Sequence, residues 1–417
     1  MNARTKRLNL VFTSKGPVNH PLHEWLEDVA DRTIVIGSRA AREQTPDAVA
    51  DHFAGWCTSP DYAGAVTELL AAGLVADFAV GAAAAISEYD VFRVARLRAL
   101  GGMPGQSAES ALRYRDKWLM KCAAREGGVP VPRMARADSG AALREAAERF
   151  GLPVVVKPSR MASSEGVRLV ADEAELADCA AGLDAGLAAG TAPPTLVEEF
   201  VDAPLFHVDG LMRSGEIVMA LASEYIRPPL DFVRAARVRG SAVLDADDPR
   251  SPALVAAARR TVAALGSPEH VLSFHAEFFL PAGREPVLCE IGCRTGGGGI
   301  TPMVEAVTGV NLRRESVRGQ LGLDGSAPSS ERRTSSGFVV VPPGEGTLVR
   351  APDRMPFDWV VAGSIHGRPG ARPGRARKLT DHVLLAAVVG RDRRQVRERI
   401  DALAAWWHEN TLWEATC

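Results

Sequence analysis

Two glutamates predicted to face each other across a β-hairpin constrain this 417-residue chain more than any other feature. The segments Phe274–Leu280 and Val287–Ile291 are typical of antiparallel strands joined by a four-residue turn at Ala282–Glu285. That turn places Glu277 opposite Glu290, with their Cβ atoms about 5 Å apart. Two carboxylates at this distance repel each other, so they share either a proton or a cation. Oxygen ligands of this kind suit Mg²⁺. The alternative is a solvated hairpin of alternating charge.

An arginine and a run of glycines follow the second of these strands. Arg294 lies four residues after Glu290 and offers a rigid guanidinium fork that fits a phosphate or a carboxylate. The run Gly296–Gly299 has no side chains, so its backbone can approach a ligand closely, and Gly297 and Gly298 are the candidate contacts. A flexible turn that meets no ligand is the alternative interpretation.

Histidines and cysteines lie close to the two glutamates. His275 precedes Glu277 by two residues, so both side chains point to the same face of the strand. His275 is therefore a candidate for contact with a substrate or for support of a metal site, and His207 on an earlier strand is a similar candidate. Cys289 and Cys293 flank the second glutamate, but burial as small core residues explains them better than catalysis by a thiol.

Two lysines and a polar loop predict contacts to phosphate groups. Lys157 ends the strand-like run Val154–Val156, where a charge is unexpected unless it faces a polar ligand. Lys117 begins a predicted helix in the segment YRDKWLMK. The loop Pro158–Gly166 could fold over a triphosphate through its hydroxyl and amide groups, and the residues concerned are Ser163, Ser164 and Gly166. No Walker A motif is present, and an ordinary surface turn is the alternative.

The segment LVEEF, Leu196–Phe200, ends a predicted apolar strand with two carboxylates. Glu198 and Glu199 could meet an adenine amino group or a ribose, while the backbone at Phe200 reads the edge of the base. Charges that keep an edge strand soluble are an equally good explanation.

Composition argues against several other classes of protein. The 49 Lys and Arg residues nearly balance the 51 Asp and Glu residues, so the basic excess of a non-specific nucleic-acid binder is missing. Residues 69–86 form one long apolar window, but Asp77 and two glycines favour a helix end and a buried strand over a membrane span. We see no secretory signal near the N-terminus, and the six cysteines form no Cys-x-x-Cys pair. We therefore expect a cytoplasmic protein with reduced thiols.

The order of the predicted elements indicates an α/β architecture. Strand-like runs at Leu8–Thr13, Thr33–Ile36 and Asp77–Val80 alternate with helical stretches and predict a small open α/β sheet. Antiparallel strands dominate the middle of the chain. A linker rich in Ser, Pro and Gly at Gly325–Ser336 precedes a last α/β module, which ends in a helix containing Trp406.

Taken together and in order, these motifs resemble the ATP-grasp superfamily over almost the whole chain. Lys117 and Lys157 match the family's two nucleotide lysines, and LVEEF matches the hinge that grips the adenine. HAEFF and VLCEIGCR match the two metal-binding glutamates, Glu277 and Glu290, and the phosphate-side arginine, Arg294. The pattern HAEFF…EIGCRTGGGG is most similar to the carboxylate–amine ligases, especially the bacterial L-amino acid ligases that make dipeptides.

The resemblance implies a fold and a chemistry. The fold class is α/β, with an open pre-ATP-grasp domain at 1–112, two ATP-grasp subdomains at 113–195 and 196–325, and a C-terminal module at 326–417. The implied activity is ADP-forming: a carboxylate attacks ATP, and an amine then attacks the resulting acylphosphate. ATP and Mg²⁺ or Mn²⁺ are the implied cofactors and amino acids the small-molecule substrates, with no nucleic-acid or membrane partner. The sequence leaves open whether the tryptophan-containing helix forms a homodimer.

Three departures from the family pattern concern the metal, the ribose and the phosphate loop. Gly292 stands where the family commonly has a metal-binding Asn. The Glu that often binds the ribose after the hinge is missing, and Asp202 or Asp209 could replace it. The phosphate loop is also poorer in glycine than is usual.

The substrate is less constrained by the sequence than the nucleotide. The segments Ser223–Phe232 and RTGGGGI are the predicted pocket walls, and Arg227 could pair with an amino-acid carboxylate or be a plain surface charge. We expect a dipeptide or a related amide as product. A ligase for another carboxylate, and a nucleotide-binding regulator without activity, are the alternatives.

Overall fold

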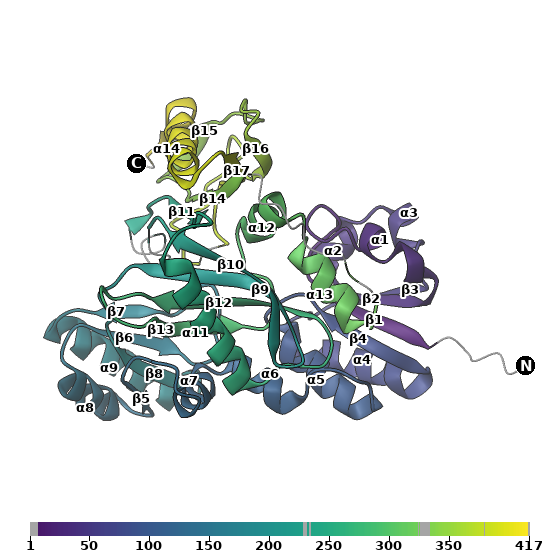
Figure 1. The fold of residues 1–417 in the computed structure, drawn as a ribbon, viewed down its shortest axis with the longest axis horizontal. Coiled ribbons are helices and arrows are strands. Elements are labelled where there is room, and N and C mark those ends of the chain that lie inside the picture. The colour runs from purple at the N-terminus through teal and green to yellow at the C-terminus, as the bar shows by residue number, and fades with distance from the viewer. Residues whose placement is uncertain are drawn as a thin grey trace, which may run out of the picture.

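The computed structural model describes residues 7–415 except 228–231, 233, 234, 324, 326–333 and 379. Three sheets hold most of the described strands, and Figure 1 shows the first of them at the N-terminal end and the last helix over the C-terminal module. Cys417, most of the predicted linker and part of the predicted pocket wall at Ser223–Phe232 lie outside the described residues.

The first sheet consists of four parallel strands in the order β3-β2-β1-β4. The elements of this region are β1 (Leu8–Thr13), α1 (Leu22–Trp25), η1 (Glu27–Arg32), β2 (Thr33–Ser38), α2 (Arg39–Glu43), α3 (Asp47–Ala50), β3 (Gly55–Ser59), α4 (Ala65–Asp77) and β4 (Val80–Ala85). The residues of β1 and β2 are almost all buried, because both faces of the sheet are covered. The strands predicted at Leu8–Thr13 and Thr33–Ile36 are confirmed.

The strand predicted at Asp77–Val80 is wrong, because α4 continues to Asp77 and the strand begins only at Val80. β4 consists mainly of alanines, which have little intrinsic preference for strands. Pairing with β1 and burial hold these alanines in the sheet, and neither is visible in the local sequence. The apolar window 69–86 is thus a helix end followed by a buried strand, as predicted.

Three helices lead from the first sheet toward the predicted nucleotide-binding residues: α5 (Asp90–Gly101), α6 (Ala108–Arg115) and α7 (Lys117–Glu126). Asp116 caps α7, since its carboxylate accepts hydrogen bonds from the amides of Trp118 and Leu119. This cap fixes Lys117 as the first residue of the helix.

A small antiparallel sheet in the order β5-β8-β6-β7 carries the second lysine at the end of β6. Its strands and the helices packed against it are β5 (Met134–Ala137), α8 (Gly140–Phe150), β6 (Val154–Pro158), β7 (Arg168–Val170), α9 (Glu173–Ala188) and β8 (Thr195–Glu199).

An eight-stranded sheet in the order β13-β12-β9-β10-β11-β14-β17-β16 forms the centre of the molecule. Its elements are β9 (Leu205–Arg213), β10 (Glu216–Tyr225), β11 (Arg239–Val243), α11 (Arg250–Leu265), β12 (Leu272–Phe279), β13 (Val287–Gly292), α12 (Ile300–Thr308), α13 (Leu312–Gln320), β14 (Ser335–Val341), β16 (Val360–Ile365), β17 (Leu384–Gly390) and α14 (Arg393–Asn410). A two-stranded sheet, β15 (Thr347–Arg350) with β18 (Leu412–Glu414), completes the C-terminal module. α13 contacts both β4 and β12 and so joins the first sheet to the central one (Figure 1).

The C-terminal module continues the central sheet, because β11 pairs with β14. The domain boundary between 325 and 326 therefore stays a proposal, as do the other domain limits. Trp407 is buried in the core of this module, where Trp406 and Trp413 pack against the same apolar cluster. A homodimer through this helix also stays a prediction.

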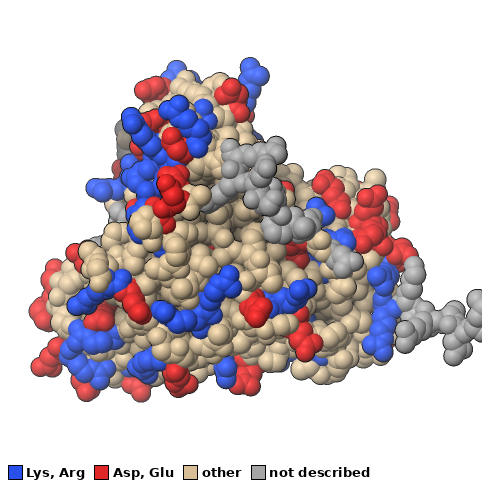
Figure 2. Space-filling view, viewed as in Figure 1, with Lys and Arg blue, Asp and Glu red and all other residues tan. Residues whose placement is uncertain are grey.

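None of the helices in the described ranges has the length and apolar character needed to cross a membrane. Figure 2 shows Lys and Arg mixed with Asp and Glu over the visible face, which agrees with the net charge of −2. The five cysteines that the structure describes are free thiols. Burial raises the pKa of both Cys289 and Cys293 to about 12, so neither thiol is activated.

Candidate active site

The pairing of β12 with β13 places Glu277 opposite Glu290, as predicted from the sequence. A β-bulge between Glu277 and Phe278 shifts the register beyond this pair by one residue. The four-residue turn predicted at Ala282–Glu285 is therefore wrong in its length, because β12 already ends at Phe279.

Protein donors hold one oxygen of Glu277. The Tyr225 hydroxyl donates to Oε1 at 2.6 Å, and His275 Nε2 lies 3.3 Å from the same oxygen. Burial raises the pKa of Glu277, but the hydrogen bonds from His275 and Tyr225 outweigh burial and keep this pKa below its ordinary value. Glu277 is thus ionised, and none of the described residues donates a hydrogen bond to its Oε2 atom.

Glu290 faces the first residue of α7. Its Oε2 atom lies 3.3 Å from Lys117 Nζ, and Lys117 also donates to the carbonyl of Met161 at 2.6 Å. Burial raises the pKa of Glu290, but the charges of Lys117 and Lys157 outweigh burial and lower the pKa to about 2. Two ionised carboxylates therefore face each other across the hairpin, which favours binding of a divalent cation between them.

A second lysine on α7 joins Lys157 at Glu198. Lys157 Nζ lies 2.8 Å from Glu198 Oε2, and Lys121 Nζ lies 2.5 Å from Glu198 Oε1. All three side chains are buried. Burial lowers the pKa of Lys121 to about 8 despite its partner, whereas Glu198 outweighs burial at Lys157 and raises the pKa of that lysine. Glu198 thus holds two ammonium groups in place behind the cavity.

The rest of the LVEEF segment is more exposed. Glu199 accepts hydrogen bonds from the backbone amide and the side chain of Arg133, and Phe200 remains 40% exposed. Both carboxylates of the segment thus already have protein partners, so their predicted contact to adenine or ribose stays a prediction.

One cavity of about 240 Å³ brings the predicted nucleotide and metal residues together. Its walls come from α7, β6, the phosphate loop, the segment after β8, and the β12–β13 hairpin. Of the residues singled out from the sequence, it is lined by Lys117, Lys157, Ser163, Ser164, Glu198, Glu199, Phe200, Glu277 and Glu290. Six other candidates do not line this cavity: Gly166, Arg227, His275, Arg294, Gly297 and Gly298.

The phosphate loop bends sharply beside this cavity. Ser163 and Ser164 both have φ of 60°, in the left-handed region that non-glycine residues rarely adopt, and Gly166 has φ of 73°. Backbone strain of this kind is often found at ligand-binding loops, so the conformation agrees with the prediction that this loop meets a ligand.

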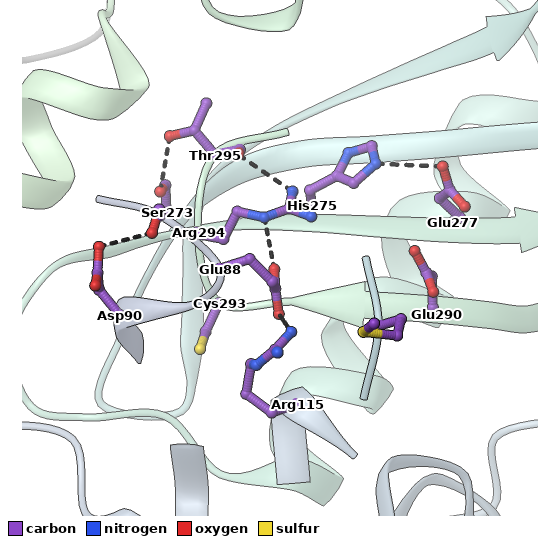
Figure 3. Close-up of polar contacts among 12 residues, drawn as sticks. Glu88, Asp90, Arg115, Ser273, His275, Glu277, Glu290, Cys293, Arg294 and Thr295 are labelled. Atoms are coloured by element: carbon purple, nitrogen blue, oxygen red, sulfur yellow. Dashed lines mark hydrogen bonds and ion pairs between the residues drawn. The ribbon is translucent and has the colours of Figure 1, made fainter. Parts of the chain in front are cut away.

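Arg294 lies in a charged network next to the cavity (Figure 3). Its Nε atom is 2.6 Å from Glu88 Oε2, and the other oxygen of Glu88 is 2.7 Å from Arg115. Arg115 also donates to the carbonyl of Arg160 in the phosphate loop. A small cavity of about 20 Å³ is lined by Arg294, His275 and Glu290, among others. Arg294, which follows β13, is therefore held beside the site by Glu88, which follows β4 of the first sheet.

A buried chain of polar groups lies behind Glu277. Asp209 contacts His207 Nδ1 at 2.5 Å with one oxygen and His275 Nδ1 at 2.8 Å with the other, and His207 Nε2 is 2.6 Å from the Ser241 hydroxyl. Burial lowers the pKa of His275, but Asp209 outweighs burial and raises it to about 9, so His275 is a cation beside Glu277. The donor atoms of His207, Asp209 and His275 are close enough to hold an ion, but they bind one another.

The glycine run crosses the same face of the sheet. A Cβ atom on Gly296 would lie 2.8 Å from His275 Nδ1, and one on Gly299 would lie 2.4 Å from the Phe338 side chain. These two glycines are required for close approach to protein atoms. Gly297 faces open space and Gly298 has φ of 68°, so a contact of these two with a ligand stays a prediction.

Arg227 is not brought to the cavity. It pairs with Asp401 of α14 at 3.7 Å, and its side chain is 40% exposed. Its predicted role in binding a substrate carboxylate stays a prediction, and the geometry favours the alternative of a surface charge.

Comparisons with known proteins agree with this arrangement. The ATP-grasp domain family matches residues 122–205. This chain contains an ATP-grasp domain. The fold is also similar to that of an L-amino acid ligase from Bacillus licheniformis, with a TM-score of 0.74 at 16% identity over 98% of this chain and 100% of that one.

Two of the curated proteins to which the chain is similar are amino acid ligases by name. The chain is 26% identical to an L-arginine-specific L-amino acid ligase of Bacillus subtilis over 60% of each chain. It is 25% identical to an alanine–anticapsin ligase of Bacillus subtilis strain 168 over 51% of this chain and 48% of that protein. The chain thus spans about half to three-fifths of the length of these relatives.

The structure also addresses the departures from the ATP-grasp pattern. Asp202 lines the cavity, whereas Asp209 is fully buried between two histidines, so the suggestion that Asp209 contacts a ribose is wrong. At Gly292, where the family commonly has Asn, an added Cβ would lie 3.1 Å from Glu88. The space of an Asn side chain is therefore filled by the Glu88–Arg294 pair.

Sequence reasoning did not single out Lys121, Glu88 or Tyr225, although Tyr225 lies within the predicted pocket wall Ser223–Phe232. Lys121 is one helical turn after Lys117, and that spacing within a helix could have indicated a shared face. Glu88 and Tyr225 carry no such signal, because only the tertiary fold brings them to Arg294 and Glu277.

Proposed function

We propose that this protein is an ADP-forming ligase that joins a carboxylate to an amine, with amino acids as substrates and a dipeptide or related amide as product. The observation that carries the proposal is the single cavity in which Glu277 and Glu290 face Lys117 and Lys157. Its supports are the ATP-grasp match and the similarity to amino acid ligases.

The residues present fit a divalent cation. Both carboxylates are ionised, they are opposite each other in the sheet, and Glu277 has one oxygen without a protein donor among the described residues. Carboxylate oxygens are hard ligands, as Mg²⁺ and Mn²⁺ require. Glu277 and Glu290 would hold the ion, which when bound supplies charge neutralisation between the phosphates of ATP.

The first chemical step is transfer of a phosphoryl group. An oxygen of the substrate carboxylate attacks the γ-phosphorus of ATP, the bond to the β–γ bridging oxygen breaks, and an acylphosphate and ADP form. Lys117 and Lys157 bind the phosphates and offset their charge, while Ser163 and Ser164 close the loop over them. No covalent contribution from the protein is needed.

The second step forms the amide. The amine nitrogen attacks the acyl carbon, an oxyanion develops, and phosphate leaves as the nitrogen loses a proton. Arg294 lines the small cavity beside His275 and Glu290 and would stabilise this oxyanion, and Glu88 fixes its orientation through its Nε atom. Removal of one such donor typically lowers the rate about 10²- to 10³-fold.

Release of phosphate together with formation of product tests the proposal. The full chain is incubated with ATP, Mg²⁺ and each of the twenty amino acids, singly and in pairs, and phosphate and product mass are measured. Phosphate that depends on two amino acids, with a product lighter than their sum by one water, is the expected result.

Two substitutions on the same hairpin provide the matched comparison. Glu290→Gln should abolish the activity, whereas Glu285→Gln, which changes an exposed carboxylate paired with Arg260, should leave it intact. Binding of ATP without phosphate release from any amino acid pair would refute the amino acid ligase. That result would leave a ligase for another carboxylate or a regulator that binds nucleotide.

A further inference from the structure

A buried arginine without an acidic partner lies close to the two facing glutamates. Arg239 of β11 is 5% exposed, and none of the described residues forms an ion pair with it. Its Nη2 atom donates to the Tyr225 hydroxyl at 3.0 Å, and its Nε atom is buried without a hydrogen-bond partner. The rings of Tyr225 and Phe338 lie 4.8 and 5.2 Å from its guanidinium. A buried charge of this kind is costly unless an anion completes it.

The other two arginines that are buried in the described part of the chain, Arg93 and Arg98, also have an Nε atom without a hydrogen-bond partner, but their terminal guanidinium nitrogens bond to carboxylate, carbonyl or amide oxygens. Arg93 pairs with Asp90 at 2.9 Å, and Arg98 donates to the carbonyl of Ala83 and to Gln320. Arg239 is held by two aromatic rings and one hydroxyl instead, an arrangement that fixes its plane and leaves hydrogen-bond donors free.

The start of α12 lies beside this arginine. A Cβ atom on Gly298 would lie 3.7 Å from Arg239 Nη1, and α12 begins two residues later, at Ile300. The cap residue Gly299 has no side chain to bond the first amides, and the first turn holds no acidic residue. Thr301 in this turn is buried, and its hydroxyl bonds no described group. Pro302 has no N–H, and the Met303 amide donates to the Gly299 carbonyl. The amides of Ile300 and Thr301 therefore remain at the start of this nine-residue helix, and together with the unpaired guanidinium they form a site for an anion.

The position relative to Glu277 limits which anion this can be. The Tyr225 hydroxyl lies between Arg239 and Glu277, bonded to both, at 3.0 and 2.6 Å. An anion at Arg239 would thus be separated from Glu277, one of the two proposed metal ligands, by the Tyr225 hydroxyl. In the proposed reaction this separation fits an anionic group of a substrate that stays intact.

We propose that Arg239 and the first turn of α12 bind the free carboxylate of the amine-donating substrate, so that the amine partner is itself an amino acid. A planar guanidinium matches a carboxylate in two parallel hydrogen bonds. The inference rests on the proposed function, since it assigns the second substrate of that reaction. Arg239 is a specificity-determining residue in this scheme, and the product keeps a free carboxylate.

Kinetics with paired substrates test the inference on the full chain. The amine substrate found in the ligase assay is compared with its α-carboxamide, for the wild type, Arg239→Gln and Arg239→Lys. The control is Arg260→Gln, an exposed arginine of α11 paired with Glu285. The wild type should prefer the free carboxylate, and Arg239→Gln should raise its KM by about 30-fold or more, as loss of one partner of a buried charge pair does. Arg239→Lys should be intermediate and Arg260→Gln unchanged.

Several results would overturn the inference. If Arg239→Gln raises the KM of ATP or of the activated acid instead, the guanidinium binds a phosphate or the reacting carboxylate. Equal effects on the free acid and its carboxamide would also refute it. If Arg239→Gln does not fold, the preference of the wild type for free acid over carboxamide and the behaviour of Arg239→Lys decide.

Binding measurements separate this inference from the proposed function. Calorimetry with each amino acid and its carboxamide, in the presence of a non-hydrolysable ATP analogue and Mg²⁺, requires no turnover. Binding of free acids only, lost in Arg239→Gln, would support the carboxylate site even if no ligase activity is found. Binding of neither form by the wild type, or of both forms alike, would refute it.

Discussion

Glu198→Gln should destabilise the protein strongly, because it leaves two lysines buried against each other without a counter-charge. The side chains of Lys121, Lys157 and Glu198 are 0%, 7% and 4% exposed. Removing one partner of a buried ion pair costs about 3–5 kcal/mol. The loss of stability has an upper limit, because the folded variant can deprotonate one lysine instead of burying its charge. At pH 7, neutralising a group of ordinary pKa 10.5 costs about 5 kcal/mol.

The same argument gives the pH dependence. Burial already lowers the pKa of Lys121 to about 8, and loss of Glu198 removes the group that opposes this effect. The folded variant then carries a neutral lysine while the unfolded chain binds the proton, so stability rises with pH. The destabilisation should fall to about 2 kcal/mol at pH 9, where deprotonating the unfolded lysine is easier.

Urea unfolding at pH 7 and pH 9 measures both effects, and the neighbouring residue provides the control. Glu199→Gln removes a carboxylate whose partner Arg133 is 57% exposed, so it should cost less than about 1 kcal/mol at either pH. Adding Lys121→Met to Glu198→Gln should recover part of the loss. Equal costs for the two glutamates, or a Glu198→Gln cost that does not change between pH 7 and pH 9, would refute the reasoning.

Three further outcomes are expected. Burial lowers the pKa of His20 to about 3, so only the unfolded chain binds a proton at this residue between pH 6.5 and pH 3, and the stability of the fold decreases as the pH falls over that range. His20→Gln should therefore flatten this part of a plot of the urea midpoint against pH. His408→Gln, which changes an exposed histidine, should not. Gly166→Ala should cost about 1–2 kcal/mol, because φ is 73° and Pro158 leaves no room, whereas Gly182→Ala in α9, with open space around it, should stabilise by about 0.5–1 kcal/mol. Lys157→Met should weaken the affinity for ATP, measured by calorimetry, by about 10- to 100-fold. The variant should still fold, since Lys121 still pairs with Glu198. An unchanged affinity for ATP would contradict a contact between Lys157 and a phosphate.

The motifs that carry charge could be read from the sequence because they are local. The pairing of Glu277 with Glu290 depends only on strand alternation and a short connection, so this prediction was confirmed although the predicted turn length was wrong. The alanine strand β4 failed this kind of reasoning, because burial and pairing place it where its own preference does not.

The partners of these charges could not be predicted in the same way. Glu88 and Arg294 are about half the chain apart, and they meet only because the first sheet packs beside the hairpin through α13. Tyr225 and Arg239 gain their positions from the order of strands in the central sheet, a property of the whole topology. Local pattern thus identifies the groups that face a ligand, while tertiary packing decides which of them are already neutralised by the protein.

That neutralisation links binding of metal to binding of nucleotide. The cations around the cavity each have a carboxylate of the protein: Lys157 and Lys121 have Glu198, Lys117 has Glu290, and Arg294 and Arg115 have Glu88. The residues that line the cavity include two lysines and six carboxylates, so the protein alone offers a triphosphate little net attraction. A divalent cation between Glu277 and Glu290 would change this balance, because it offsets the charge of the two repelling carboxylates and offers coordination positions to phosphate oxygens. The affinity of the wild type for ATP should therefore rise steeply with the Mg²⁺ concentration. Glu290→Gln should remove this dependence on Mg²⁺ rather than simply lower the affinity. A wild-type affinity for ATP that is the same with and without Mg²⁺ would contradict this coupling.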